Sequence, residues 1–319
     1  MIDFDKGKLI SSNYSGAEQK AAVLLDGVKY MLKYSDDVRD TKFNMSYKNN
    51  HFAEYIGSHI FEACGFKTHE TYLGYHKGIH DKKKMVVGCK DFTQDGANFS
   101  EFGNLAKVGM SSTKRRECNI EDVYELIEKL PMIKDKDEIK NMFWDMFVID
   151  ALIGNRDRHL GNWGLIETED DMTFAPIYDC GSSLNALADD FTMTEGLKND
   201  TKFKNDQYNV SSVYRLQGKK TLYHEIFKNP PKDLTSAIKR VVPRINMETI
   251  KKIIANTEML PELNKNYITK AVLLRYELIL APALKRIMKK EKEATQGKSL
   301  TNDLKKYKQV ADKHNENRG

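Results

Sequence analysis

The sequence predicts an α+β protein of two lobes, with a small antiparallel sheet in residues 1–93 and a mostly helical remainder in residues 94–319. An Asp-Gly pair at 26–27 separates two apolar runs near the N-terminus, which is a strong signal for a β-hairpin. Apolar residues recur at helical spacing in the second half, and the chain after the Pro-Pro pair at 230–231 is helical in pattern almost throughout. A length of 319 residues also exceeds one typical hydrophobic core.

The N-terminal hairpin places a lysine near the end of its second strand. Residues 21–25 and 28–34 form the two apolar runs, and Lys33 lies at the end of the second run. The next stretch with helical spacing covers about 51–64 and carries Glu54 in its first turns. Taken alone, Lys33 could be an exposed strand lysine, and Glu54 could be a charge that balances the helix dipole.

The middle of the chain predicts a packed helix followed by a short hairpin. Apolar residues recur at spacings of three and four from Glu138 to Ile153, and Gly154 ends the helix. Residues 163–168 and 172–178 form two strand patterns joined by an acidic turn. Three polar stretches are expected to be loops, namely 94–103, 111–116 and 181–217. A loop as long as the last one is usually functional.

Two carboxylates and an amide follow this helix and hairpin in a spacing that suits phosphoryl transfer. Asp157 and Asn162 lie five residues apart after the helix, and Asp179 follows 17 residues later at the end of the hairpin. Phosphoryl transfer needs one carboxylate to orient the acceptor hydroxyl and accept its proton, and an Asn with an Asp to hold Mg²⁺. The spacing matches the catalytic loop of protein kinases, with Asp-Cys-Gly in place of Asp-Phe-Gly. The alternative is a surface loop with scattered charges and a capping Asp.

Several motifs together resemble one family of bacterial kinases. They are Ser15-Gly-Ala-Glu-Gln-Lys20, Lys33, Ala53-Glu54-Tyr55, Ala63-Cys-Gly-Phe66, Asp157-Arg-His-Leu-Gly-Asn162 and Pro176-Ile-Tyr-Asp179. In this order, over roughly residues 10–280, they resemble the HipA-type serine/threonine kinases. The resemblance implies a two-lobed protein-kinase-like fold, which is distantly shared with phosphoinositide kinases. It also implies that ATP binds between the lobes and that Lys33 faces Asp179.

The resemblance implies a role for each matching residue. Asp157 would be the catalytic base, and Asn162 and Asp179 would be the Mg²⁺ ligands. Lys33 would hold the phosphates of ATP, and Glu54 would orient Lys33. His159 would brace the catalytic loop or the phosphates. The phosphate-covering loop would contain Ser15, Gly16 and Ala17. The hinge strand, which would present backbone groups to adenine, would contain Cys89, Lys90 and Asp91.

The sequence also departs from the HipA pattern. The family carries an autophosphorylated serine just before the glycine turn, and Asn13 occupies that position here, with Ser11 and Ser12 beside it. Control by that modification is therefore in doubt. The family's Gly-Ala-Gln becomes Gly-Ala-Glu-Gln, which leaves the register of Glu18 and Gln19 open. The glycine turn begins near residue 15, so we expect the family's additional N-terminal subdomain to be absent.

Composition excludes several classes of protein. A hydrophobic content of 40% with 10% aromatic residues is typical of a globular chain. No run approaches 18 apolar residues, so no transmembrane helix is expected. The N-terminus lacks the pattern of a signal peptide, which predicts a cytoplasmic protein as synthesised, although the resemblance suggests export into host cells. The four cysteines form no Cys-x-x-Cys pair and are expected to be reduced.

The positive charge is concentrated at the C-terminus. Residues 284–319 contain 11 Lys and Arg against 5 Asp and Glu, an excess of six, while the whole chain carries a net charge of +5. Helical spacing continues from residues 268–280 into 284–293, and residues 300–310 could form one more helix. The tail is either a solvated end or a patch that binds an acidic protein or an anionic surface. Nucleic acid is not favoured as a partner, because few aromatic residues are interleaved with the basic ones.

Three functions remain open at this point. The first and favoured one is an ATP- and Mg²⁺-dependent serine/threonine protein kinase, which also phosphorylates itself. The second is a lipid or small-molecule kinase on the same fold, suggested by the Asp-Arg-His motif at 157–159 and the basic tail. The third is a non-catalytic HipA-type toxin module that acts through a partner. The complete set of Lys33, Glu54, Asp157, Asn162 and Asp179 argues against the third.

Overall fold

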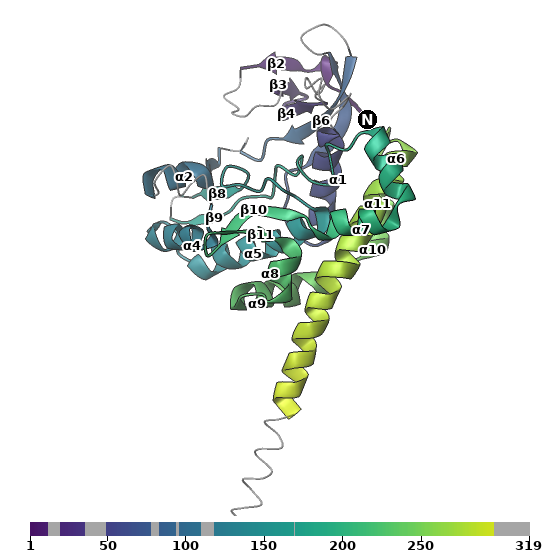
Figure 1. Cartoon of the computed structure of the whole chain (residues 1–319). Helices are drawn as coiled ribbons and strands as arrows, with labels where there is room; N and C mark the ends of the chain where they lie inside the picture. The colour runs from purple at the N-terminus through teal and green to yellow at the C-terminus, as the bar shows by residue number, and fades with distance from the viewer. Residues whose placement is uncertain are drawn as a thin grey trace, which may run out of the picture.

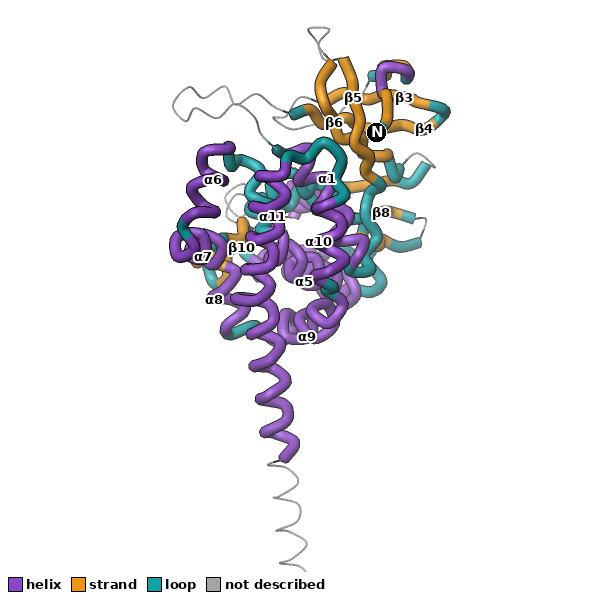
Figure 2. Tube along the Cα trace, turned by 90° about the vertical axis from the view of Figure 1, so that its right-hand side faces the viewer, coloured by secondary structure: helices purple, strands orange, loops and turns teal. Residues whose placement is uncertain are grey.

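The computed structural model shows a two-lobed α+β architecture, as the sequence predicted. A six-stranded sheet lies at one end of the molecule and most helices lie at the other (Figures 1 and 2). The structure describes residues 1–11, 20–35, 49–77, 83–93, 96–109, 118–168 and 170–296.

The N-terminal sheet has the strand order β1-β5-β6-β4-β3-β2. Its strands are β1 (Ile2–Asp3), β2 (Lys8–Ile10), β3 (Lys20–Leu25), β4 (Val28–Tyr34), β5 (Thr71–Lys77) and β6 (Lys83–Lys90). A short 3-10 turn, η1 (Phe4–Lys6), follows β1. All neighbouring strands are antiparallel except β1 and β5. Asp26 and Gly27 both have positive φ, 51° and 78°, as a type I′ hairpin turn requires, and β3 and β4 form the predicted hairpin around them.

One helix, α1 (Asn50–Ala63), packs against strands β5 and β6 of this sheet. Its buried apolar residues include Phe52, Ile56 and Ile60, which recur every four residues and form the face turned to the core. Glu54 lies on this helix and is fully buried. The predicted helix over 51–64 is therefore confirmed, and its one buried carboxylate is placed beneath the sheet.

The C-terminal lobe is built around α5 (Lys136–Ile153), which is buried over most of its length. Its Asp135 N-cap accepts a hydrogen bond from the Glu138 N–H, and Gly154 ends it in the left-handed conformation with φ 67°. The surrounding helices are α2 (Phe102–Gly109), α4 (Ile120–Lys129), α6 (Asp190–Lys198), α7 (Asp200–Tyr208), α8 (Tyr223–Lys228), α9 (Lys232–Val241), the 3-10 turn η2 (Val242–Arg244), α10 (Met247–Ala255) and α11 (Glu262–Arg275).

Two small sheets complete this lobe. The first has the order β7-β8-β9, from β7 (Asn98–Glu101), β8 (Gly164–Glu167) and β9 (Met172–Phe174). The second pairs β10 (Ser211–Leu216) with β11 (Lys219–Leu222). The hairpin predicted over 163–178 is therefore present, with a second strand that ends at Phe174.

Two of the predicted loops contain regular structure instead. The stretch 94–103 contributes β7 and the start of α2, because β7 pairs with β8 more than 60 residues away and such pairing leaves no local signal. The stretch 181–217 contains α6, α7 and β10. Both helices are polar and bury few side chains, but Asp189 and Asn199 cap them by accepting hydrogen bonds from backbone N–H groups. The loop predicted at 111–116 lies outside the described residues.

The last helix leaves the body of the molecule. From α11 the chain passes through a π-helical turn (Tyr276–Leu280) and stays helical through residues 281–296, as predicted for 284–293. Figure 1 shows this segment extending away from the other helices. The predicted helix at 300–310 lies outside the described residues. Over the described ranges, the helices lack the combination of length and apolar character needed to cross a bilayer.

Candidate active site

Three charged residues from distant parts of the chain meet where the two lobes join. The Lys33 Nζ atom of β4 lies 2.9 Å from Glu54 Oε2 of α1 and 2.7 Å from Asp179 Oδ1 of the C-terminal lobe. Lys33 and Glu54 are 3% and 0% exposed. Lys33 therefore faces Asp179, as expected. Charges this deeply buried are costly unless they are paired, so the three side chains hold one another in place.

The protonation states support this pairing. Burial by itself would lower the pKa of Lys33, but the charges of Asp179 and Glu54 hold that pKa well above its usual value. Burial would raise the pKa of Glu54, whereas Lys33 and then His69 hold it well below its usual value. The pKa of Asp179 is also lowered, because Lys33 outweighs the effect of its burial. The cluster is therefore one ammonium between two carboxylates.

Close backbone approach fixes Asp179 against α1. Asp179 has φ 60°, a left-handed conformation that Asp tolerates better than most residues, and its N–H donates to Glu54 Oε1 at 2.9 Å. A Cβ atom on Gly57 of α1 would lie 2.6 Å from the Cβ of Cys180. Only glycine at position 57 lets α1 approach the Asp-Cys-Gly segment this closely. Gly57 has no local sequence signal, because its close contact is with Cys180 in a distant segment.

The catalytic-type loop is held by a buried ion pair that sequence reasoning missed. Arg158 donates through Nε and Nη2 to both oxygens of Asp150, at 2.9 and 3.1 Å. Its Nη1 atom donates to the carbonyl oxygen of Asn162 at 2.8 Å and also to that of Tyr178. One guanidinium thus joins the helix α5, the loop and the segment that leads to Asp179. A carboxylate inside the apolar run 139–153 was the available signal for this pair.

The loop arranges Asp157, Asn162 and His159 on one short turn. The Asn162 Nδ2 atom donates to the carbonyl oxygen of Asp157 at 2.6 Å, which leaves the amide oxygen as the atom that can meet a cation. The His159 Nδ1 atom accepts from the Gly161 N–H at 3.0 Å, so the imidazole braces the turn. Neighbouring groups partly shield the Asp157 carboxylate from water, which raises its pKa, with His159 opposing and Asp179 reinforcing that shift. A raised pKa suits a group that accepts a proton.

The oxygen donors of Asn162 and Asp179 fit a hard cation such as Mg²⁺. Lys33 contacts one carboxylate oxygen of Asp179, so the other oxygen is the one that can turn to a metal. Over the described residues, Glu54, His69 and Cys89 form the one cluster of three ligand-type residues, with ligand atoms within 4.8 Å of one another. This cluster does not suit a metal, because Lys33 already supplies its positive charge and burial raises the pKa of the Cys89 thiol well above its usual value.

Two backbone N–H groups of the predicted adenine-binding strand already have partners within the protein. Residues 83–90 form a central strand of the sheet, where the N–H of Lys90 donates to the Glu70 carbonyl oxygen at 2.9 Å. The N–H of Asp91 donates to the Lys29 carbonyl oxygen, also at 2.9 Å, and the Asp91 carboxylate pairs with the Lys29 ammonium. These two N–H groups are therefore not available to adenine. The Cys89 side chain points to the Glu54 cluster instead.

Ser15, Gly16 and Ala17, which were predicted to cover the phosphates, lie outside the described residues. The structure therefore brings together Lys33, Glu54 and Asp179 directly, and it holds Asp157 and Asn162 on the adjoining loop.

Comparison with known proteins supports the resemblance found in the motifs. Residues 12–249 match the family described as the HipA-like C-terminal domain. The chain is 35% identical over 262 residues to the serine/threonine-protein kinase CtkA of Helicobacter pylori, which covers 80% of this chain and 78% of the relative. The length and the N-terminal start of the sequence also predict similarity to this small HipA-like kinase, and the comparison confirms it.

Solved structures agree on the fold. The crystal structure of the proinflammatory kinase CtkA of H. pylori superposes with a TM-score of 0.80 at 32% identity, and the match covers 90% of this chain and 98% of that one. HipA of Shewanella oneidensis MR-1, solved in a complex with HipB and operator DNA, gives a TM-score of 0.52 at 14% identity over 84% of this chain and 65% of that one. The second match supports the fold alone.

Proposed function

The chain belongs to the family of HipA-like C-terminal domains and is a serine/threonine protein kinase, and we propose that it transfers the γ-phosphate of ATP, with Mg²⁺, to a protein hydroxyl. We also propose that it phosphorylates itself. The observation that carries the proposal is the buried Lys33–Glu54–Asp179 cluster, which lies beside a loop that presents Asp157 and Asn162. An ammonium with a carboxylate and an amide oxygen is the set of groups that phosphoryl transfer requires.

In this proposal each residue has one task. Lys33 contacts the phosphates of the nucleotide, and Glu54 keeps the ammonium in place. Asn162 and Asp179 hold Mg²⁺, which neutralises charge on the phosphates when it is bound. Asp157 accepts a hydrogen bond from the acceptor hydroxyl and takes its proton as the oxygen forms its bond to phosphorus and the bond to the leaving ADP oxygen breaks. The Asp157 pKa, raised by partial burial of the carboxylate, favours this acceptance.

The outer contacts are assigned by family resemblance. Ser15, Gly16 and Ala17 would cover the phosphates, and His159 would support the loop that carries Asp157. The excess of six positive charges after residue 283 would attract an acidic protein or an anionic surface. This last contact concerns the choice of partner and not the transfer step.

The function is tested with the purified chain, labelled ATP and Mg²⁺. A casein-type protein and phosphoinositide vesicles serve as separate acceptors, so that protein and lipid kinases are distinguished. We expect label on the protein acceptor and on the chain, and we expect Asp157→Ala to abolish both while a fluorescent ATP analogue still binds. Asp170→Ala is the matched control, because this exposed aspartate lies in the β8–β9 turn, away from the cluster. Label on the lipid alone, or full activity of Asp157→Ala, would contradict the proposal.

A further inference from the structure

The Glu54 carboxylate has a third partner that no step of the proposed transfer uses. Its Oε2 atom accepts from Lys33 and its Oε1 atom accepts from the Asp179 N–H. The Nε2 atom of His69 also lies 2.9 Å from Oε1. His69 is 3% exposed, and it comes from the linker between α1 and β5. Glu54 is therefore held on one side by the sheet, on a second by the C-terminal lobe and on a third by this linker.

The linker is tied to the chain just before Asp179. The Ile177 N–H donates to the Lys67 carbonyl oxygen at 2.8 Å, and the His69 N–H donates to the Ile177 carbonyl oxygen at 3.0 Å. Thr68 and Ile177 thus form a parallel bridge. His69 consequently contacts Glu54 through its ring and the segment preceding Asp179 through its backbone. A shift of this residue would move both carboxylates that pair with Lys33.

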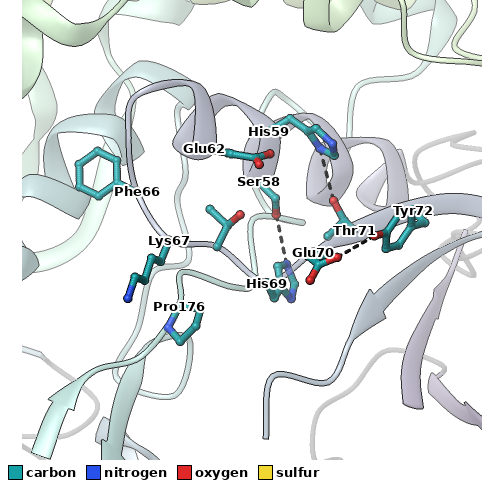
Figure 3. A pocket seen from close by; sticks show the side chains of 11 residues that line it. Ser58, His59, Glu62, Phe66, Lys67, His69, Glu70, Thr71, Tyr72 and Pro176 are labelled. Carbon is teal, nitrogen blue, oxygen red and sulfur yellow. Dashed lines mark hydrogen bonds between the residues drawn. The ribbon is translucent and has the colours of Figure 1, made fainter. Parts of the chain in front are cut away.

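His69 also lines a surface cavity, and Lys33 is not among its lining residues. The cavity has a volume of about 560 Å³ and is bordered by α1, the linker, the start of β5 and Pro176 (Figure 3). Ser58 of α1 and His69 both line the cavity and contact each other, with 3.1 Å between Ser58 Oγ and His69 Nε2. Glu54 is not among the lining residues. The Nε2 atom of His69 therefore contacts both a residue that lines the cavity and the carboxylate of the buried charge cluster.

We propose that His69 is a positioning residue for phosphoryl transfer, which holds Glu54 in the orientation that presents Lys33, and that the cavity admits small nitrogen heterocycles to this position. The proposal rests on the proposed kinase function. Without the imidazole, Oε1 retains only the Asp179 N–H, and the carboxylate can rotate away from Lys33. A catalytic group that is misplaced by about 1 Å can lose about 10²-fold in rate, so a distant support has a measurable effect.

The first test compares substitutions at this position. We expect His69→Ala to lower kcat by about 10- to 100-fold, which corresponds to one hydrogen bond to a charged group, while KM for the acceptor protein stays near wild type. His69→Gln can still donate from its amide to Glu54 and should recover most of the rate. His69→Phe fills the space without a donor and should not. An unchanged kcat in His69→Ala overturns the proposal, as does equal activity of the Gln and Phe variants.

The second test is chemical rescue. Adding imidazole to His69→Ala should restore kcat with a saturable concentration dependence, because the cavity leads to the vacated position. The matched control is His59→Ala. It removes an imidazole that lines the same cavity, and whose Nδ1 atom donates to the Tyr55 carbonyl oxygen at 2.8 Å instead of contacting Glu54. This control should keep near-wild-type kcat and show no response. An identical response of both variants to imidazole, or none in His69→Ala, refutes the positioning role.

Failure of the kinase function would be recognised separately. A wild-type chain that labels no acceptor contradicts the proposed function, whatever the variants do. The affinity for a fluorescent ATP analogue then decides the role of His69, because a displaced Lys33 weakens phosphate binding. Weaker binding in His69→Ala that is restored in His69→Gln supports the role, and equal affinity in wild type and both variants overturns it. Thermal melts of each variant show that the fold is retained.

Discussion

Replacement of Arg158 by methionine tests whether the buried ion pair organises the catalytic loop. Arg158 and Asp150 are 2% and 0% exposed, and the guanidinium makes two hydrogen bonds to the carboxylate. Methionine is similar in length and apolar, so Arg158→Met removes the charge without a large cavity. It leaves Asp150 as an unpaired buried carboxylate, with the Asn155 amide as its remaining donor. It also removes the donor that reaches the Asn162 carbonyl oxygen.

The expected loss of stability is large. Removing one partner of a buried ion pair costs about 3–5 kcal/mol, because the remaining charge is desolvated. For a chain of this size the midpoint of thermal unfolding should fall by roughly 6–10 °C. Burial already raises the pKa of Asp150, and loss of Arg158 raises it further. The loss of stability in Arg158→Met should therefore be complete at neutral pH. It should become smaller as the pH falls, because Asp150 then takes up a proton.

A double variant separates stability from function. Asp150→Asn combined with Arg158→Met removes the unpaired charge, so the melting midpoint should recover by several degrees. Activity should not recover, because the carbonyl oxygen of Asn162 still lacks its guanidinium donor and the loop that carries Asp157 is released. We expect kcat at least about 10-fold below wild type in both the single and the double variant.

Arg240→Met provides the matched control. Arg240 of α9 pairs at 2.6 Å with Asp145, which lies on α5 like Asp150. The Arg240 side chain is 33% exposed and pairs with this carboxylate instead of the catalytic-type loop. Because Asp145 is only 6% exposed, loss of its partner should also lower the melting midpoint, but kcat should stay near wild type. The assays are thermal melts followed by circular dichroism and initial rates with labelled ATP. A wild-type midpoint in Arg158→Met, or full activity in the double variant, would refute this account of the loop.

Three further predictions follow from the site and the sequence. Gly57→Ala should lower kcat by about 10-fold or more, because the added Cβ would lie 2.6 Å from the Cβ of Cys180 and force α1 away from the Asp-Cys-Gly segment. Ala53→Gly on the same helix is the control, and equal kcat values in the two variants would contradict this prediction. Acidification below about pH 4.5 should lower the melting midpoint, because protonation of Glu54, whose pKa is depressed in the folded chain, progressively removes the stability that its ionised form contributes. A Glu54→Gln variant should show a weaker dependence, with the remainder due to other carboxylates of depressed pKa such as Asp179; an unchanged dependence would contradict this. Deleting residues 298–319 should leave phosphoryl transfer to a neutral peptide unchanged but weaken transfer to acidic proteins. High salt should have the same effect on the wild-type chain, because it screens the attraction between exposed charges. An equal loss for both substrates would count against a docking role.

The motif residues were predictable because phosphoryl transfer restricts chemistry and spacing together. Asp157 and Asn162 had to share one turn, and Asp179 had to return to them through a hairpin. The strand end that carries Lys33 and the helix that carries Glu54 were recognisable from local periodicity. Their direct contact is a geometric observation, while the roles in catalysis remain proposals.

Other parts of the fold gave no local signal. The hydrogen bonds of Lys90 and Asp91 depend on which strands flank β6, so the availability of their N–H groups could not be judged from sequence. The helices α6 and α7 lack an apolar stripe, and a polar sequence of that kind resembles a loop. Strand β7 pairs across a long separation, which periodicity does not reveal.

The sequence by itself determined which chemical groups are available, their order along the chain and the secondary structure that carries most of them. Only the tertiary structure decided which buried partners hold these groups, namely Arg158 with Asp150, His69 with Glu54, and Gly57 against Cys180. The physical reason is that a motif depends on spacing within one segment. Burial and pairing of charges depend on segments that are distant in the sequence and meet only when the chain packs.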